Sequence, residues 1–336
     1  MTKPSDITYK DAGVDTEKAQ ELVHDIGALR ARTEKKRQLT SSFGLFAAGF
    51  DLSEWKQPVL FTGCDGVGTK LELLLEYDLP EVAGVDLVGM SVNDVLTCNA
   101  APVLFLDYLG IAKLDNVLLA RLVAGMVDAL EACDCILAGG ETAEMPGMVP
   151  EGTVELSGFC IGVAEKEDVI DPTTVQAGDK IFGIASDGIH ANGFSLVRKV
   201  LSTYGDDFSA EEIKGLLSAT RLYHGEVEAT RAAGLRPHAM AHITGGGIRE
   251  NLPRVLGDHG ADVTLPEWDN PPVQKLISKV TADTAVHTFN MGIGYMFVMA
   301  AEDAAAFTAA VPHAVELGTV SDEAGVRITL PSGDVL

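Results

Sequence analysis

The residues best suited to chemistry in this chain lie in short glycine-rich segments that follow apolar stretches. The first is Gly63-Cys64-Asp65-Gly66-Val67-Gly68-Thr69-Lys70, directly after an expected strand at 58–64. Glycines let backbone N–H groups point at an anion, Lys70 can add a positive charge, and Asp65 can hold a metal ion against phosphates. The segment does not match the P-loop pattern GxxxxGK[ST]. A glycine-rich turn with a surface lysine is the alternative interpretation.

Carboxylates also lie on the otherwise apolar segment 81–99, whose spacing predicts a helix. Asp86, Asn93 and Thr97 fall opposite the apolar stripe, and Asp94 lies beside them. A carboxylate on an apolar helix is costly unless it is paired or bound to a metal. Oxygen ligands of this kind suit Mg²⁺, which keeps waters and substrate phosphates as its other ligands. Simple exposure of this face to water is the alternative.

A third segment reads Gly-Gly-Glu-Thr-Ala-Glu-Met-Pro-Gly at 139–147 and is expected to be a loop after a strand at 135–138. Glu141 could bind a metal, contact a substrate amidine or act as a base. A Pro-Gly turn with solvated acids explains the same spacing.

Two further loops stand between a strand and a helix. In Ser-Asp-Gly-Ile-His-Ala-Asn-Gly, at 186–193, His190 and Asn192 could contact a substrate, although a lone histidine in a loop is more often structural. In His-Ile-Thr-Gly-Gly-Gly, at 242–247, Gly245, Gly246 and Gly247 could cradle a phosphate. Three consecutive glycines cost backbone entropy on folding, so a flexible turn alone would rarely need them.

Alternating helices and strands must position these loops. Periodicity predicts strands at 58–64, 102–109, 135–138, 154–164, 180–185, 238–243, 292–300, 314–320 and 326–330. It predicts helices at 15–32, 81–99, 115–133, 194–204, 302–310 and near 218–234. The class is therefore mixed α and β (α+β). The polar, turn-rich segment 165–180 is the expected boundary, which gives domains 1–168 and 169–336.

Composition narrows the functional classes. The 336 residues carry a formal net charge of −24, so binding of nucleic acid through a broad basic face is not expected. Any anionic substrate must be held by local amides and a few cations. The five cysteines form no CxxC pair, which favours reduced thiols in the cytoplasm over a zinc site or a disulfide framework. No signal peptide and no membrane-spanning segment is evident.

Taken in order, the motifs resemble those of the aminoimidazole ribonucleotide synthetase family, the phosphoribosylformylglycinamidine cyclo-ligases. The similarity covers almost the whole chain. It runs through YKDAGVD at 9–15, DGVGTK at 65–70, SVND at 91–94, PVLFLDYL at 102–109, GGETAEMPG at 139–147, GFCIGVAEK at 158–166, HANGFSLVRK at 190–199, HITGGGIRENLPRVL at 242–256 and TFNMGIGY at 288–295. YKDAGVD and GGETAEMPG are specific to this family within its superfamily.

The resemblance implies a two-domain fold and a homodimer in which the amino-terminal domains join their strands into a shared β-barrel. It implies ATP and Mg²⁺ as cofactors. The implied reaction is the ATP-dependent cyclisation of formylglycinamidine ribonucleotide to 5-aminoimidazole ribonucleotide, with release of ADP and phosphate, in purine biosynthesis.

It also implies roles for individual residues. Asp65 and Asp94 are expected to bind Mg²⁺. The expected contacts to ATP phosphates are Gly66, Gly68, Thr69, Lys70, Gly245, Gly246 and Gly247. The expected catalytic residues are Glu141, His190 and Lys70, and the expected substrate contacts are His190, Asn192 and Asn290.

The sequence differs from the family pattern at two places. The segment 38–50 keeps only Gly44 and Gly49, where the family is usually richer in glycine. His242 stands where relatives of the selenophosphate synthetase type carry a metal-binding aspartate.

Two other functions are alternatives. The first is another kinase-like member of the superfamily. However, a selenophosphate synthetase needs a reactive Cys or Sec near its amino terminus, and the first cysteine here is Cys64. A non-catalytic acidic scaffold is the second.

Overall fold

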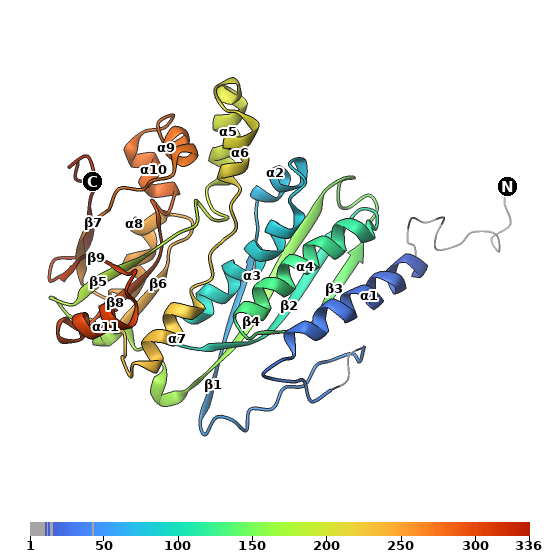
Figure 1. Ribbon diagram of the computed structural model, residues 1–336, viewed down its shortest axis with the longest axis horizontal. Helices are drawn as coiled ribbons and strands as arrows, with labels where there is room; N and C mark the ends of the chain where they lie inside the picture. Colours follow the sequence, from blue (N-terminus) through green and yellow to red (C-terminus); the bar gives the residue numbers. More distant parts are fainter. Residues whose placement is uncertain (1–10, 12, 14–15, 42–43) are drawn as a thin grey trace.

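Two β-sheets, one from each half of the chain, form the framework of the protein (Figure 1). The structure is a computed structural model that describes residues 11, 13, 16–41 and 44–336. The first sheet has the strand order β1-β4-β2-β3, and the second has the order β10-β7-β9-β5-β8-β6. Helices and strands alternate in both halves, which confirms the mixed α and β class. Most of the YKDAGVD motif lies outside the described residues.

The first sheet carries its helices on one face. Its strands are β1 (Pro58–Gly66), β2 (Ala101–Ile111), β3 (Ile136–Glu144) and β4 (Val154–Glu165), antiparallel except for the parallel pair β2–β3. Its helices are α1 (Thr16–Arg30), α2 (Lys70–Glu76), α3 (Pro80–Leu96) and α4 (Asn116–Ala132). Figure 1 shows α3 and α4 side by side over the sheet, with α1 next to α4.

The other face of this sheet is open. Gly63 of β1 and Gly158 of β4 face α3, so strand alternation turns Leu60 and Phe159 the other way. Their side chains are 55% and 42% exposed. The first sheet therefore presents large apolar side chains to its surroundings.

Local sequence explains the α3–α4 pair. The Asp115 side chain caps α4 by accepting hydrogen bonds from the amides of Val117 and Leu118, both at 3.1 Å. Gly84 of α3 and Gly125 of α4 lie where the helices cross, and a side chain at either position would collide with the backbone of the other helix. The two glycines thus allow close backbone contact.

The second sheet is buried on both faces at its strands β5, β6 and β8. Its strands are β5 (Lys180–Ala185), β6 (Ala239–His242), β7 (Gly260–Thr264), β8 (Ile293–Met299), β9 (Val315–Ser321) and β10 (Gly325–Thr329). Its helices are α5 (Phe194–Tyr204), α6 (Ala210–Leu216), α7 (His224–Ala232), α8 (Gly247–Asn251), α9 (Pro271–Ile277), α10 (Ala282–Thr288) and α11 (Ala304–Ala310). One hydrophobic core extends from this sheet into the first half, and a second core fills its other side.

The structure corrects two sequence expectations. The 139–147 segment is not a loop from its first residue, because β3 continues to Glu144 by pairing with β2. The helix expected near 218–234 begins only at His224, because the backbone of 218–223 bonds to side chains of the first half. Helices α2, α6, α9 and α10 and strand β7 were not expected. Within the described ranges, no helix is long and apolar enough to cross a membrane.

Candidate active site

An acidic corner forms where β1, α3 and β6 end. Asp94 lies at the carboxyl end of α3, is 47% exposed, and meets Nδ1 of the buried His242 through its Oδ1 atom at 2.8 Å. Asp65 accepts a hydrogen bond from the amide of Gly66 at 2.7 Å. Burial raises the pKa of the Asp65 carboxyl, and the negative charge of Asp94 raises it further, although the Gly66 amide and His242 oppose this rise. The structure thus brings the two expected magnesium ligands together.

This corner suits a hard divalent cation held partly by other oxygens. Two carboxylates close to each other repel, and a cation between them would relieve that repulsion. Among the described residues, no set of three or more His, Cys, Asp or Glu side chains is arranged to hold a metal ion. Mg²⁺ commonly takes one or two carboxylates and completes its shell with waters and phosphate oxygens, so Asp65 and Asp94 fit it.

A cleft of about 400 Å³ opens beside Asp65, between the two halves of the chain. Gly66 and Gly68 line one wall and Asn192 lines the other. Gly68 has a positive φ of 64° and no atom within 4 Å of the position a side chain would take, so its backbone faces free space. Thr69 extends the contact between the halves through its hydroxyl, 3.1 Å from that of Ser195. An anion in this cleft would meet backbone amides beside the carboxylates.

The glycine loop at 244–247 adjoins the same cleft. A side chain on Gly245 would lie 3.4 Å from the Asn192 side-chain oxygen. Gly246 and Gly247 both have positive φ angles, 87° and 60°. The side-chain amide nitrogen of Asn251 donates hydrogen bonds to three carbonyls of the loop. These are the carbonyls of Thr244, Gly245 and Gly247, at 3.3, 3.1 and 2.8 Å. Asn251 therefore fixes the loop, a role the sequence did not reveal.

Lys70 does not lie where the sequence indicated. Its ammonium is fully buried, 2.7 Å from the carboxylate of Asp86, and donates a hydrogen bond to the carbonyl of Ser218 at 2.6 Å. Burial lowers the Lys70 pKa, and Asp86 opposes that shift. Lys70 is also not among the residues that line the cleft. Lys70 thus has a structural role in this arrangement, and its expected phosphate contact and catalytic role stay predictions.

Asp86 and Asn93 also differ from expectation, because both are buried against the second half. Asp86 accepts hydrogen bonds from the amide and the hydroxyl of Thr220, both at 2.7 Å. Asn93 donates to the carbonyl of Arg221 at 2.8 Å and accepts from the amide of Tyr223 at 3.1 Å. We call residues 218–223 the strap, because side chains of the first half hold its backbone.

The strap borders His190. The amide of Arg221 is 3.5 Å from Nε2 of His190, whose backbone has a φ of 60°. His190 is 1% exposed, and Nδ1 has no hydrogen-bond partner among the described residues. Burial, together with the nearby His242, Lys70 and Arg221, holds the His190 pKa well below its usual value. The imidazole is therefore neutral near pH 7.

Asn290 forms hydrogen bonds with the backbone and a side chain around the loop that carries His190. It is buried, donates to the carbonyl of Gly188 at 2.9 Å, and accepts from the amide of Gly292 at 3.0 Å and from the hydroxyl of Ser186 at 3.3 Å. These bonds occupy its carbonyl oxygen and one of its two N–H donors. Asn290 thus shapes the loop, and the direct substrate contact that the resemblance implied stays a prediction.

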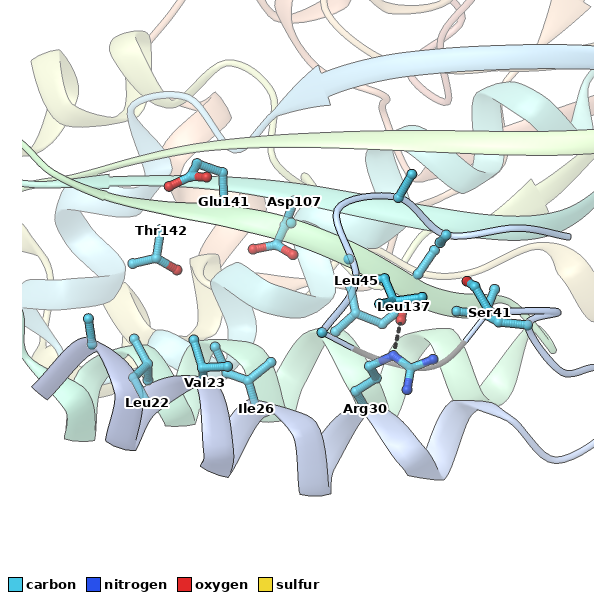
Figure 2. Close-up of a pocket in the computed structure, with 18 of the residues that line it drawn as sticks. Leu22, Val23, Ile26, Arg30, Ser41, Leu45, Asp107, Leu137, Glu141 and Thr142 are labelled. Atoms are coloured by element: carbon cyan, nitrogen blue, oxygen red, sulfur yellow. Dashed lines mark hydrogen bonds between the residues drawn. The ribbon is translucent and has the colours of Figure 1, made fainter. Parts of the chain in front are cut away.

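Glu141 lies in a different cavity, between β3, α1 and residues 39–41 and 44–48, as Figure 2 shows. Asp107 of β2 lines the same cavity. The sequence offered only a weak signal for Asp107, a single acid in the apolar run PVLFLDYL. Glu141 is thus not a lining residue of the cleft beside Asp65.

The fold and site define a two-domain α/β protein with an acidic corner and glycine-rich loops facing one cleft. Residues 50–164 match the family described as AIR synthase related protein, N-terminal domain, and residues 176–331 match its C-terminal domain. A Thermosynechococcus vestitus protein named phosphoribosylformylglycinamidine cyclo-ligase is 42% identical over 96% of this chain and 99% of its own length. An Exiguobacterium protein of the same name is 39% identical over 96% and 98%. The chain belongs to this phosphoribosylformylglycinamidine cyclo-ligase family.

Solved structures share the fold at low sequence identity. Hydrogenase maturation protein HypE in complex with ATP is 18% identical, with a TM-score of 0.69 over 95% of this chain and 93% of that one. Thiamine-monophosphate kinase from Stenotrophomonas maltophilia is 17% identical, with a TM-score of 0.65 over 90% and 94%. At these identities the likeness establishes the fold alone.

Proposed function

We propose that this chain catalyses the ATP-dependent cyclisation of formylglycinamidine ribonucleotide to 5-aminoimidazole ribonucleotide, with release of ADP and phosphate. The observation that carries the proposal is the match to curated cyclo-ligases at about 40% identity over nearly the whole of both chains. The cleft between the halves supports it, because the Asp65 carboxylate and the open backbone of Gly68 line it together.

The chemistry needs a better leaving group than an amide oxygen. Transfer of the γ-phosphoryl group to the formyl oxygen makes that oxygen part of a phosphate ester. The amidine nitrogen then attacks the same carbon, the C–N bond closes the ring, and phosphate leaves with the oxygen. Bound Mg²⁺ would neutralise charge on the transferring group. The chain's own task is to hold the two reacting groups together, which removes much of the entropic barrier.

Different residues would bind the metal ion and the phosphates. Asp65 and Asp94 would hold Mg²⁺, and the amides of Gly68 and Gly245 would contact phosphate oxygens. The amide of Gly66 donates to Asp65, so Gly66 would fix that carboxylate at the wall of the cleft. The neighbouring Thr69, Gly246 and Gly247 complete these two loops.

Three side chains have less direct roles in the proposal. Asn192 lines the cleft and would contact the substrate. Neutral His190 could accept a proton from the amidine, provided that its ring becomes accessible. Glu141 remains a predicted base or ligand in the separate cavity.

The competing superfamily reactions are less well supported. The relatives at about 40% identity carry the cyclo-ligase name, whereas the thiamine-monophosphate kinase is only 17% identical. A non-catalytic scaffold would have no need to keep Asp65 and Asp94 together beside open amides.

The proposal includes a homodimer whose amino-terminal sheets form a shared barrel. The open face of the first sheet supports it, because Leu60 and Phe159 leave apolar area uncovered. Sedimentation velocity should give a dimer for the native chain. The variants Leu60→Glu and Phe159→Glu should sediment as monomers with unchanged circular dichroism, whereas a native monomer would contradict the barrel.

The domain division at 168/169 and a cytoplasmic location are also proposals. The two sheets share no strand and are separated by the segment 166–179, which supports the division. All five cysteines are free thiols, as expected in a reducing compartment.

The test of the reaction is direct. ADP release from Mg²⁺-ATP should require formylglycinamidine ribonucleotide and should match the amount of aminoimidazole product. The Asp65→Asn and Asp94→Asn variants should lose most turnover and need more Mg²⁺ for what remains. ADP release that is independent of this substrate, or that responds to another phosphoryl acceptor, would reject the cyclo-ligase assignment.

A further inference from the structure

The walls of the cleft between the two halves carry negative charge. Of the described residues that line it, Asp65 and Glu155 carry carboxylates, and none is a lysine, an arginine or a histidine. A cleft lined by one sign of charge attracts ligands of the opposite sign. The proposed reaction brings two positive groups to the cleft, the Mg²⁺ that accompanies ATP and the amidine of the substrate. The two carboxylates and the two cations therefore have to be matched.

Glu155 lies on β4, just beyond the end of β1. The last pair between these strands is Gly66 with Ser157, so Glu155, two residues before Ser157, lies alongside the turn that contains Gly68. Its side chain is exposed, whereas its neighbours Val154 and Leu156 are buried. Within the described ranges the Glu155 carboxylate has no hydrogen bond and no ion pair. It is therefore free to meet a ligand in the cleft.

Asp65 is the better partner for the metal ion. Its carboxylate lies close to that of Asp94, which repels it, and a cation between the two relieves this repulsion. In the proposed function Mg²⁺ takes this pair and completes its shell with waters and phosphate oxygens. Glu155 is then the carboxylate of the cleft that is left for the second cation.

We propose that Glu155 binds the amidine of formylglycinamidine ribonucleotide and makes the cleft prefer this amidine over the corresponding amide. The inference rests on the proposed function, which makes this ribonucleotide the substrate. An alkyl amidine is a strong base and carries a proton near neutral pH. Its N–H groups lie in one plane and can donate to both oxygens of a carboxylate, as the guanidinium of arginine does. The corresponding amide is neutral and would turn an acceptor oxygen toward the carboxylate of Glu155.

Glu141 is the other acid that the sequence associated with an amidine, but it lies in the separate cavity beside β3, together with Asp107. Burial raises the pKa of Asp107 to about 7, and the negative charge of Glu141 adds to this rise while a backbone amide opposes it. Neither acid lines the cleft in which Mg²⁺ at Asp65 would hold the transferring group. The amidine must attack the carbon whose oxygen receives that group, so it has to lie in the cleft with Glu155.

The substitution Glu155→Gln tests this contact. Glutamine keeps the length of the side chain and one acceptor oxygen, loses the charge, and can donate to a carbonyl oxygen. Isothermal titration calorimetry without ATP would give the dissociation constants of the amidine ribonucleotide and of its amide analogue. Glu323→Gln, at an exposed acid between β9 and β10, is the matched control for the loss of one negative charge. Thermal melting would establish that each variant is folded.

The expected change is in the preference between the two ligands. The native chain should bind the amidine at least about tenfold more tightly than the amide. Glu155→Gln should bind the amidine about tenfold more weakly than the native chain and the amide no more weakly, so the preference should nearly disappear. Glu323→Gln should keep the native preference, and the KM for ATP should stay unchanged in Glu155→Gln. A merely structural side chain would affect both ligands alike.

Two results would overturn the inference. One is a native preference in Glu155→Gln, which together with a raised Mg²⁺ requirement would make Glu155 a metal ligand. The other is a loss of the preference in Glu141→Gln but not in Glu155→Gln, which would place the amidine in the separate cavity. In both cases the proposed function stands as long as the native chain makes aminoimidazole. A native chain that neither binds the amidine nor makes aminoimidazole would reject the proposed function itself.

Discussion

At the scale of the residue, Lys70 shows that burial can change what a charged side chain does. Its ammonium lies between the Asp86 carboxylate and the Ser218 carbonyl, with no exposure to solvent. Removing one partner of a buried ion pair leaves the other charge uncompensated, which is much more costly than replacing both. Lys70 is therefore expected to act on stability before it acts on nucleotide binding.

The substitution Lys70→Met should lower the free energy of unfolding by about 3–5 kcal/mol, because it leaves Asp86 buried and uncompensated. The double variant Lys70→Met, Asp86→Asn should recover much of this loss, since asparagine keeps an acceptor for Thr220. Urea denaturation measures both. Lys199→Met, at an exposed lysine, is the matched control. Unchanged stability with a raised KM for ATP would instead place Lys70 at the phosphates.

Asp107 should make stability depend on pH. Its folded pKa of about 7 lies above the ordinary value of 3.8, so between these pH values the folded chain binds more protons than the unfolded chain. Stability should therefore fall as the pH rises from about 4 to about 7 and then level off. Asp107→Asn should flatten this part of the profile and gain on the order of 2 kcal/mol near pH 8. A variant profile parallel to the native one would contradict the raised pKa.

At the scale of the element, the loop at 244–247 depends on one side chain outside it. Asn251→Ala should cost about 1–3 kcal/mol of stability, because three loop carbonyls lose their shared donor. Amide hydrogen exchange should accelerate at 244–248 and remain native in β8. Ser332→Ala, on an exposed turn, controls for general effects. Native exchange in the Asn251 variant would mean that glycine geometry alone fixes the loop.

The sequence predicted the elements with strong periodicity well. The helix expected at 115–133 is α4, with its Asp115 cap, and the strand expected at 154–164 is β4. Prediction from the sequence failed where contacts between distant parts of the chain override the local pattern. The strap 218–223 continues a helical pattern, yet its backbone is not helical, because it bonds to Asp86 and Asn93. No local signal reveals a partner more than a hundred residues away.

The candidate site shows the same division. Asp65, Asp94 and the glycine loops were predictable because backbone freedom and carboxylates leave a local signature. Asn290 and Asn251 were not assigned their supporting roles, because those depend on which carbonyls and amides the fold brings to them. Asp107 was missed because one acid in an apolar run gains meaning only from the cavity in front of it.

At the scale of the whole molecule, the formal charge of −24 opposes the approach of anionic substrates. Raising NaCl from about 10 mM to about 150 mM shortens the screening length from about 30 Å to about 8 Å. The value of kcat/KM for both ATP and formylglycinamidine ribonucleotide should therefore rise, by about two- to threefold, at fixed free Mg²⁺. A fall with added salt would show that local cations dominate the approach.

The strap also bears on how the chain acquires its structure during synthesis. Thr220 is 134 residues after Asp86, and the ribosome must add these residues before the two can form their hydrogen bonds. At about 5–20 residues per second, the ribosome needs roughly 7 to 27 s to add them. During that interval the nascent first half holds an acid and a lysine whose final burial site does not yet exist. The last steps of its folding must therefore wait until the strap has left the exit tunnel.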